Sequence, residues 1–127
     1  MPRANLAETP VALDEEMIEI RLAELADYSC VFEKHKADSD PAPLYVGLPD
    51  DRCQCTHLGY VTRGKVVFRY ADRDETIEAG EMYVATPGHT PLVFAGTELV
   101  EFTKTDELNR TVAVISKNLE AMKAGAV

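Results

Sequence analysis

The stretch Cys53-Gln54-Cys55-Thr56-His57-Leu58-Gly59-Tyr60-Val61-Thr62-Arg63-Gly64 is the most informative part of this chain. Two thiols and an imidazole occupy every second position of its first half, and the residues after them are typical of a strand that ends in a glycine turn. Alternate residues of a β-strand point to the same face of a sheet. If residues 53–62 form one strand, the three side chains share a face, which indicates a metal site.

The rest of the chain repeats the strand pattern in short segments. Apolar and polar residues alternate over residues 17–22 and 65–70, which is the two-residue period of a half-buried strand. Further short strands are predicted at residues 28–34, 75–78, 82–85, 91–94 and 98–102, separated by glycine, proline and aspartate. Short strands at such spacing predict an all-β sandwich or barrel.

The two ends of the chain differ from this pattern. Residues 1–14 are polar and contain Pro2 and Pro10, so we expect an irregular N-terminal arm. Near the other end, apolar residues recur at spacings of four and three, at Leu108, Val112, Ile115, Leu119 and Met122. This period predicts an α-helix over about residues 105–124, packed on the barrel or on a partner subunit. With 127 residues in all, we expect one domain over residues 1–127.

The acidic composition narrows the classes of partner. A formal net charge of −9 argues against nucleic acid or an anionic membrane as the partner and favours a small-molecule ligand. No apolar run approaches the roughly 20 residues of a membrane-spanning helix. The first residues lack the basic and apolar segments of a secretory signal, so we expect a cytoplasmic protein.

The three cysteines do not suggest a disulfide framework, because their number is odd and no secretory signal precedes them. Cys30 lies within a predicted strand, and we interpret it as a small core residue. Cys53 and Cys55 are better explained as free thiols or as metal thiolates. The simpler alternative for Cys53, Cys55 and His57 is a half-buried strand with two core cysteines and one hydrogen-bonded histidine.

Residues 44–102 resemble the cupin superfamily, whose first motif is G-x5-H-x-H-x3/4-E-x6-G. The final glycine of that motif aligns with Gly64. Counting back from it, His57 stands at the position of the usual glutamate ligand, Cys53 at that of the second histidine and Asp51 at that of the first. Cys55 falls between the ligand positions.

The second cupin motif is G-x5-P-x-G-x2-H, and both of its glycines are present, as Gly80 and Gly88. Thr86 stands at the position of its proline and Pro91 at that of its histidine. His89 lies two residues earlier, with the parity that would let its side chain point inward. The framework matches the family, but the usual ligands are replaced.

The resemblance implies a cupin-like double-stranded β-helix, or jelly-roll barrel, with a metal inside and a C-terminal α-helix. The candidate metal ligands are Cys53, Cys55, His57 and His89. Two thiolates and two imidazoles are a soft set that suits zinc best, with copper(I) or iron also possible. His89 is also the candidate catalytic acid or base, at the rim of the barrel.

Other polar residues near these motifs are interpreted as structural. Tyr60 has the opposite parity to His57 and should face away from the metal, and His35 is expected at the surface. Tyr83 and Glu101 are assigned no role beyond the fold. The pair Asp50 and Asp51 is interpreted as a turn before the strand and not as a second metal site.

Three functions remain open at this point. The first is a small metal-dependent enzyme acting on a small organic molecule, for which the resemblance implies dioxygenase, isomerase, lyase or cyclase activity. The second is a non-catalytic metal- or ligand-binding module such as a sensor, and the third is a metal-free barrel that binds a hydrophobic molecule. We also expect a homodimer, in which the strand containing Ile18, Ile20 and Leu22 extends the sheet of a partner.

Overall fold

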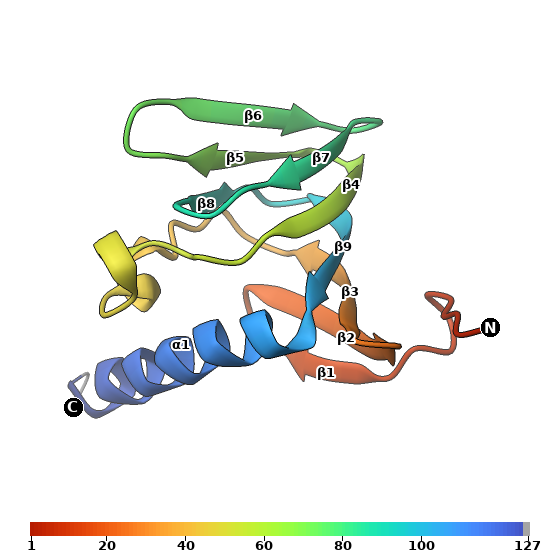
Figure 1. Cartoon of the computed structure of the whole chain (residues 1–127), viewed down its shortest axis with the longest axis horizontal. Helices are drawn as coiled ribbons and strands as arrows, with labels where there is room; N and C mark the ends of the chain where they lie inside the picture. Colours follow the sequence, from red (N-terminus) through yellow and green to blue (C-terminus); the bar gives the residue numbers. More distant parts are fainter. Residues whose placement is uncertain (126–127) are drawn as a thin grey trace.

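Nine β-strands form two antiparallel sheets over residues 1–125, which the computed structural model describes (Figure 1). The larger sheet has the order β1-β2-β3-β9-β4-β7 and the smaller one the order β6-β5-β8. The strands are β1 (Val11–Asp14), β2 (Ile18–Leu25), β3 (Tyr28–His35), β4 (His57–Arg63), β5 (Lys65–Arg69), β6 (Asp74–Glu78), β7 (Met82–Ala85), β8 (Thr90–Val93) and β9 (Glu98–Lys104). Two 3-10 helices, η1 (Ala42–Tyr45) and η2 (Pro49–Asp51), precede β4, and the helix α1 (Thr105–Gly125) follows β9.

The predicted all-β barrel with a C-terminal helix is confirmed, and its core lies between the two sheets. The alternation in β5 places Val66 and Phe68 inside, and the facing strands contribute the rest of the apolar cluster. Its members are Val61, Val66, Phe68, Tyr83, Ala85, Val93 and Leu99. This cluster fills one part of the barrel, and next to α1 the buried Cys55 contacts Thr111.

The turn between β4 and β5 needs glycine at position 64. Gly64 has a φ of +75°, a conformation that side-chain-bearing residues rarely adopt. A Cβ at this position would also lie 2.6 Å from Oγ1 of Thr97. The backbone conformation and the close contact with Thr97 therefore explain why glycine stands at this position of the first cupin motif.

The predicted strand over residues 53–62 is shorter than expected, because β4 begins only at His57. Cys53 instead forms an isolated antiparallel bridge with His89, in which the Cys53 amide donates to the His89 carbonyl at 2.8 Å. The three side chains therefore do not share the face of one regular strand. Cys53 and Cys55 lie on an extended segment that is bridged to His89, just before β8. His57 is the first residue of β4.

The N-terminal region is more ordered than the sequence suggested. Residues 11–14 of the expected irregular arm form β1, which pairs with β2. β3 pairs along the whole of one edge of β2, and β1 covers the other edge over residues 19–21, so the edge at Ile20 is not free. The expected dimer, in which Ile18, Ile20 and Leu22 extend a partner's sheet, is therefore wrong in its geometry.

The helix α1 packs through polar residues as well as through part of the predicted apolar stripe. Thr111 is its buried residue, and Asn118 donates hydrogen bonds of 2.8 Å to the carbonyls of Leu44 and Val46 beside η1. Of the predicted stripe, Leu108 and Ile115 are half-buried, whereas Val112, Leu119 and Met122 are exposed, so only part of the stripe packs on the barrel. No described helix has the length and apolarity needed to cross a bilayer.

Candidate metal centre

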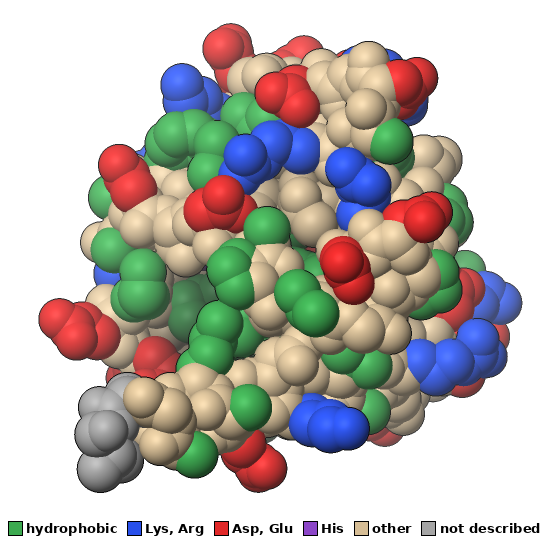
Figure 2. Space-filling view, turned by 90° about the vertical axis from the view of Figure 1, so that its left-hand side faces the viewer, with side chains coloured by type: hydrophobic (Ala, Val, Ile, Leu, Met, Phe, Trp, Pro, Cys, Tyr) green, Lys and Arg blue, Asp and Glu red, His purple; other side chains and the backbone are tan. Residues whose placement is uncertain are grey.

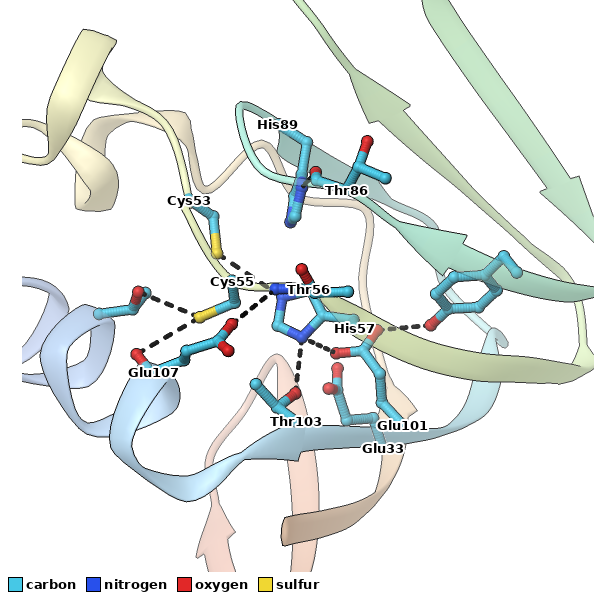
Figure 3. A network of polar contacts seen from close by, with 12 residues as sticks. Glu33, Cys53, Cys55, Thr56, His57, Thr86, His89, Glu101, Thr103 and Glu107 are labelled. Atoms are coloured by element: carbon cyan, nitrogen blue, oxygen red, sulfur yellow. Dashed lines mark hydrogen bonds and ion pairs between the residues drawn. The ribbon is translucent and has the colours of Figure 1, made fainter. Parts of the chain in front are cut away.

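Cys53, Cys55 and His57 converge in the interior, where their ligand atoms all lie within 4.8 Å of one another (Figure 3). Each residue is at most 8% exposed. Ligand atoms around a tetrahedral zinc ion are roughly 3.3–3.8 Å apart, given bond lengths of about 2.0–2.3 Å. The distance between Sγ of Cys53 and Nε2 of His57 is 3.6 Å, which lies in that range, and no pair of ligand atoms is more than 4.8 Å apart. The three side chains form a soft donor set of two sulfurs and one nitrogen, which fits zinc, copper(I) or iron.

The two thiols interact with each other and with α1. A hydrogen bond between them lowers the pKa of Cys55 and raises the pKa of Cys53. Sγ of Cys55 also lies 3.3 Å from Oγ1 of Thr111 and 3.5 Å from the carbonyl oxygen of Glu107. The Glu107 carboxylate accepts a hydrogen bond from the amide of Thr56 at 3.0 Å. Through these contacts the first turns of α1 fix the position of Cys55.

The orientation of His57 is set from the side opposite to the thiols. Its Nδ1 lies 2.6 Å from Oγ1 of Thr103 and 3.2 Å from Oε1 of Glu101. Its Nε2 lies 3.6 Å from Sγ of Cys53. With the proton on Nδ1 shared by these oxygens, the lone pair of Nε2 points towards the thiols. A carboxylate behind a histidine in this way is a common arrangement in protein metal sites.

Glu101 is itself part of a buried chain of contacts. Its second oxygen accepts a hydrogen bond from the Tyr83 hydroxyl, and burial raises the pKa of both side chains. The Tyr83 ring lies over Gly59, where a Cβ would be 2.2 Å from Cζ of the ring. Glycine at position 59 therefore allows Tyr83 to reach Glu101.

Tyr83 and Glu101 were expected to be structural only, but both lie behind His57: Glu101 contacts Nδ1 of His57, and Tyr83 donates a hydrogen bond to Glu101. The alternation of residues in the predicted strand over residues 98–102 could have indicated that Glu101 points inward. Glu101 has the same parity in β9 as Leu99 and Thr103, which are buried, whereas Phe102 is exposed. A carboxylate on the inner face of a strand requires a buried polar partner, and His57 supplies one.

His89 lies next to the cluster of Cys53, Cys55 and His57 but is not one of its three members. It is 1% exposed, and its ring centroid lies 5.2 Å from that of His57. Its Nδ1 donates a hydrogen bond of 2.6 Å to the carbonyl of Thr86, which directs Nε2 away from that carbonyl. Burial lowers the pKa of His89 to about 4, so the ring is neutral near pH 7. A neutral imidazole with an available Nε2 can bind a metal or accept a proton.

Of the remaining sequence predictions, those for Tyr60, Asp50, Asp51 and Cys30 agree with the structure, and the one for His35 does not. Tyr60 is 41% exposed and has the opposite parity to the buried His57, Asp50 and Asp51 form the turn η2, and Cys30 is buried. The surface position expected for His35 is wrong, because this residue is 7% exposed and its Nε2 lies 3.0 Å from Oε1 of Glu33. All three histidines are thus buried, and Figure 2 shows none on its face of the molecule.

Comparison with known proteins identifies the fold. No protein-family model matches the chain, and no curated protein matches it. Solved structures do: ectoine synthase from P. lautus has a TM-score of 0.57 and 15% identity over 82% of this chain and 78% of its own. An RmlC-like cupin from Shewanella frigidimarina has a TM-score of 0.52 and 9% identity, covering 80% and 89% of the two chains.

KdgF from a Halomonas species, with a TM-score of 0.52 and 14% identity over 77% and 88% of the two chains, is similar as well. These likenesses show that the chain has the jelly-roll fold of the cupins, so it is cupin-like in its fold. Its interior carries a Cys53, Cys55 and His57 cluster that could hold a metal ion. At such low identities the fold alone is shared, and function has to be argued from this cluster.

Proposed function

We propose that this cupin-like protein binds one transition metal ion through Cys53, Cys55 and His57. The observation that carries the proposal is the convergence of three buried ligand atoms within 4.8 Å, with the imidazole oriented by Glu101. Zinc is the favoured ion because thiolate and imidazole ligands suit it, and copper or iron remain alternatives. The three cysteines are free thiols, which supports a reducing compartment such as the cytoplasm.

We further propose that the protein is a metal-dependent enzyme acting on a small organic molecule. A bound divalent ion would supply a Lewis acid that polarises an oxygen atom of the substrate or a water molecule. The three protein ligands leave a fourth position, which is typical of catalytic sites. His89 borders the cluster as a neutral base and would accept a proton at Nε2. One of the similar solved structures, ectoine synthase, is named as an enzyme, which is in line with this proposal.

The second candidate is a non-catalytic module, such as a sensor, in which His89 is the fourth ligand and closes the site. One observation favours it: His89 is 1% exposed with its ring centroid 5.2 Å from that of His57, and its Nδ1 is held by the carbonyl of Thr86, which leaves Nε2 available as a ligand. A closed site with four protein ligands is typical of structural zinc. The two candidates therefore differ in whether His89 Nε2 binds the metal.

Elemental analysis of protein purified without an affinity tag tests metal binding. We expect about one equivalent of metal per chain, and its loss in Cys53→Ser and in His57→Ala. The matched control is Cys30→Ser, because Cys30 is a buried thiol on β3 outside the cluster, and it should keep the metal. Less than about a tenth of an equivalent in the unmodified protein, also after reconstitution with zinc, copper or iron, contradicts the proposal.

Cobalt(II) substitution separates the two candidates. Its visible absorption depends on the number and type of ligands, so the spectrum of the cobalt protein reports the coordination sphere. If His89 is a base and not a ligand, His89→Ala leaves this spectrum unchanged. If His89 closes the site, the same substitution changes the spectrum and weakens cobalt binding.

A further inference from the structure

Tyr45 belongs to η1, which lies against both α1 and β8 (Figure 1). The side-chain amide of Asn118 donates hydrogen bonds of 2.8 Å to the carbonyls of Leu44 and Val46, the two neighbours of Tyr45. Val46 is 53% exposed whereas Tyr45 is half-buried, so the two side chains leave η1 in different directions. The helix α1 therefore fixes the direction in which the Tyr45 side chain enters the molecule.

The hydroxyl end of Tyr45 lies in the barrel interior, near the metal cluster. Burial raises the pKa of Tyr45, and the negative charges of Cys53, Glu33, Glu101 and Cys55 raise it further. Interactions between charges weaken with distance, so these four side chains lie around the hydroxyl. They come from the segment before β4, from β3 and from β9, which are different walls of the interior. The phenol thus faces the same space as the cluster.

The Tyr45 hydroxyl is a hydrogen-bond donor without an acceptor. Within residues 1–125 it makes no hydrogen bond, whereas the hydroxyls of Tyr70 and Tyr83 both have acceptors. In the same part of the chain, the fully enclosed side-chain nitrogen and oxygen atoms that lack a hydrogen-bond partner belong to Arg69 alone. The Tyr45 oxygen is not one of them, so a water-sized molecule can reach it. Because an interior donor without a partner is unfavourable, a bound molecule is the expected acceptor.

The surroundings of the hydroxyl limit the chemistry of that molecule. Two thiolates already balance the charge of a divalent ion, and Glu33 and Glu101 line the same space, so a further anion is disfavoured. A neutral carbonyl oxygen fits, because it has two lone pairs. One lone pair can bind the ion, and the other can accept a hydrogen bond from Tyr45. Both contacts stabilise negative charge that develops on this oxygen during a reaction.

We propose that Tyr45 donates a hydrogen bond to the carbonyl oxygen of the substrate, next to the open position of the metal centre, and that the substrate is a small neutral carbonyl compound such as an amide or a ketone. The inference rests on the proposed function, because it needs an ion held by Cys53, Cys55 and His57 with one position free. In this arrangement Tyr45 keeps its proton, and His89 is the group that accepts one.

Two small ligands of the cobalt(II) protein test the role of Tyr45. Acetohydroxamate binds metals through oxygens that keep a lone pair for a second contact, whereas imidazole binds through its only lone pair. Tyr45→Phe should raise the dissociation constant of acetohydroxamate about 10-fold, through the loss of one hydrogen bond, and leave that of imidazole unchanged. The control Tyr60→Phe removes the hydroxyl of a residue that is 41% exposed and should change neither.

The outcomes separate this inference from the proposed function. Equal changes for the two ligands in Tyr45→Phe, or no change for either, overturn the inference. Cobalt protein that binds neither ligand also overturns it, since the metal then has no open position, although metal binding itself stands. A chain that takes up no cobalt overturns both the inference and the proposed function.

Thermal unfolding gives an independent reading. Since the Tyr45 hydroxyl bonds to no residue within 1–125, Tyr45→Phe should leave the melting temperature unchanged. Tyr83→Phe is the matched comparison, because it removes a hydrogen bond to Glu101 and should lower the melting temperature. A melting temperature that falls as much in Tyr45→Phe shows that the hydroxyl supports the fold, and it overturns the inference.

Discussion

Nδ1 of His57 lies 3.2 Å from Oε1 of Glu101, and this contact fixes which nitrogen of the imidazole faces the two thiols. Removing the negative charge should weaken metal binding, because a neutral amide orients and polarises the ring less strongly. We expect Glu101→Gln to lower metal affinity by about 10–100-fold, measured by competition with a chromophoric chelator. Glu98→Gln is the matched control, since Glu98 lies on the same strand as Glu101 but pairs with Arg63. Equal affinities of the two variants would contradict this role of Glu101.

A methyl group at position 59 should disturb the same contact from further away. The Cβ of Gly59→Ala would lie 2.2 Å from the Tyr83 ring, so the ring must move away from Glu101. Overpacking of this kind costs about 1–3 kcal/mol of unfolding free energy, and the metal affinity should fall as well. Urea denaturation measures the first effect and chelator competition the second.

The control for that substitution is Gly125→Ala, because within residues 1–125 no atom apart from its chain neighbours and its own helix backbone lies within 4 Å of an added Cβ. It should leave both the unfolding free energy and the metal affinity unchanged. A normal stability in Gly59→Ala would mean that Tyr83 can shift at no cost. The contacts among Gly59, Tyr83 and Glu101 would then not be rigid.

Metal affinity should fall as the pH is lowered. Only thiolates bind the ion, so protons compete with the metal for Cys53 and Cys55. The raised pKa of Cys53 means that its proton must be displaced throughout the neutral range, whereas the lowered pKa of Cys55 makes its thiolate easier to form. His89 has a pKa of about 4 and stays neutral above pH 6.

We therefore expect the affinity to change by at least about 10-fold per pH unit between pH 6 and 8, with tighter binding at higher pH. Chelator competition at several pH values measures this slope, and proton release on metal addition gives an independent reading. An affinity that does not change over this range would show that the thiols are not ligands.

The contact between α1 and η1 should contribute to stability. The Asn118 amide donates to two carbonyls, of Leu44 and Val46, and its loss leaves both acceptors without this donor. Asn118→Ala should lower the unfolding free energy by about 1–3 kcal/mol and increase hydrogen exchange in residues 42–48. The control is Asn109→Ala, since Asn109 is exposed on the same helix and should have little effect. Equal stabilities would assign the docking of α1 to its apolar contacts.

The site was only partly predictable, for reasons that differ between residues. The spacing of Cys53, Cys55 and His57 predicted that they lie together, and they do, although residues 53–56 are not part of a regular strand. The approach of His89 depended on an antiparallel bridge to Cys53, which local sequence does not encode. The burial of His35 was missed because its neighbours are charged. Its position depends on β3 pairing with β2 and β9.

The sequence by itself determined the local features: strand alternation at Val66 and Phe68, the turn at Gly64 and the presence of a C-terminal helix. Those features depend on side-chain period and backbone sterics within a few residues. Only the tertiary structure placed Glu101 and Tyr83 behind His57 and left Val112 exposed. Those outcomes depend on which strands become neighbours and which side of α1 finds a partner, and the contacts that decide them are distant in the chain.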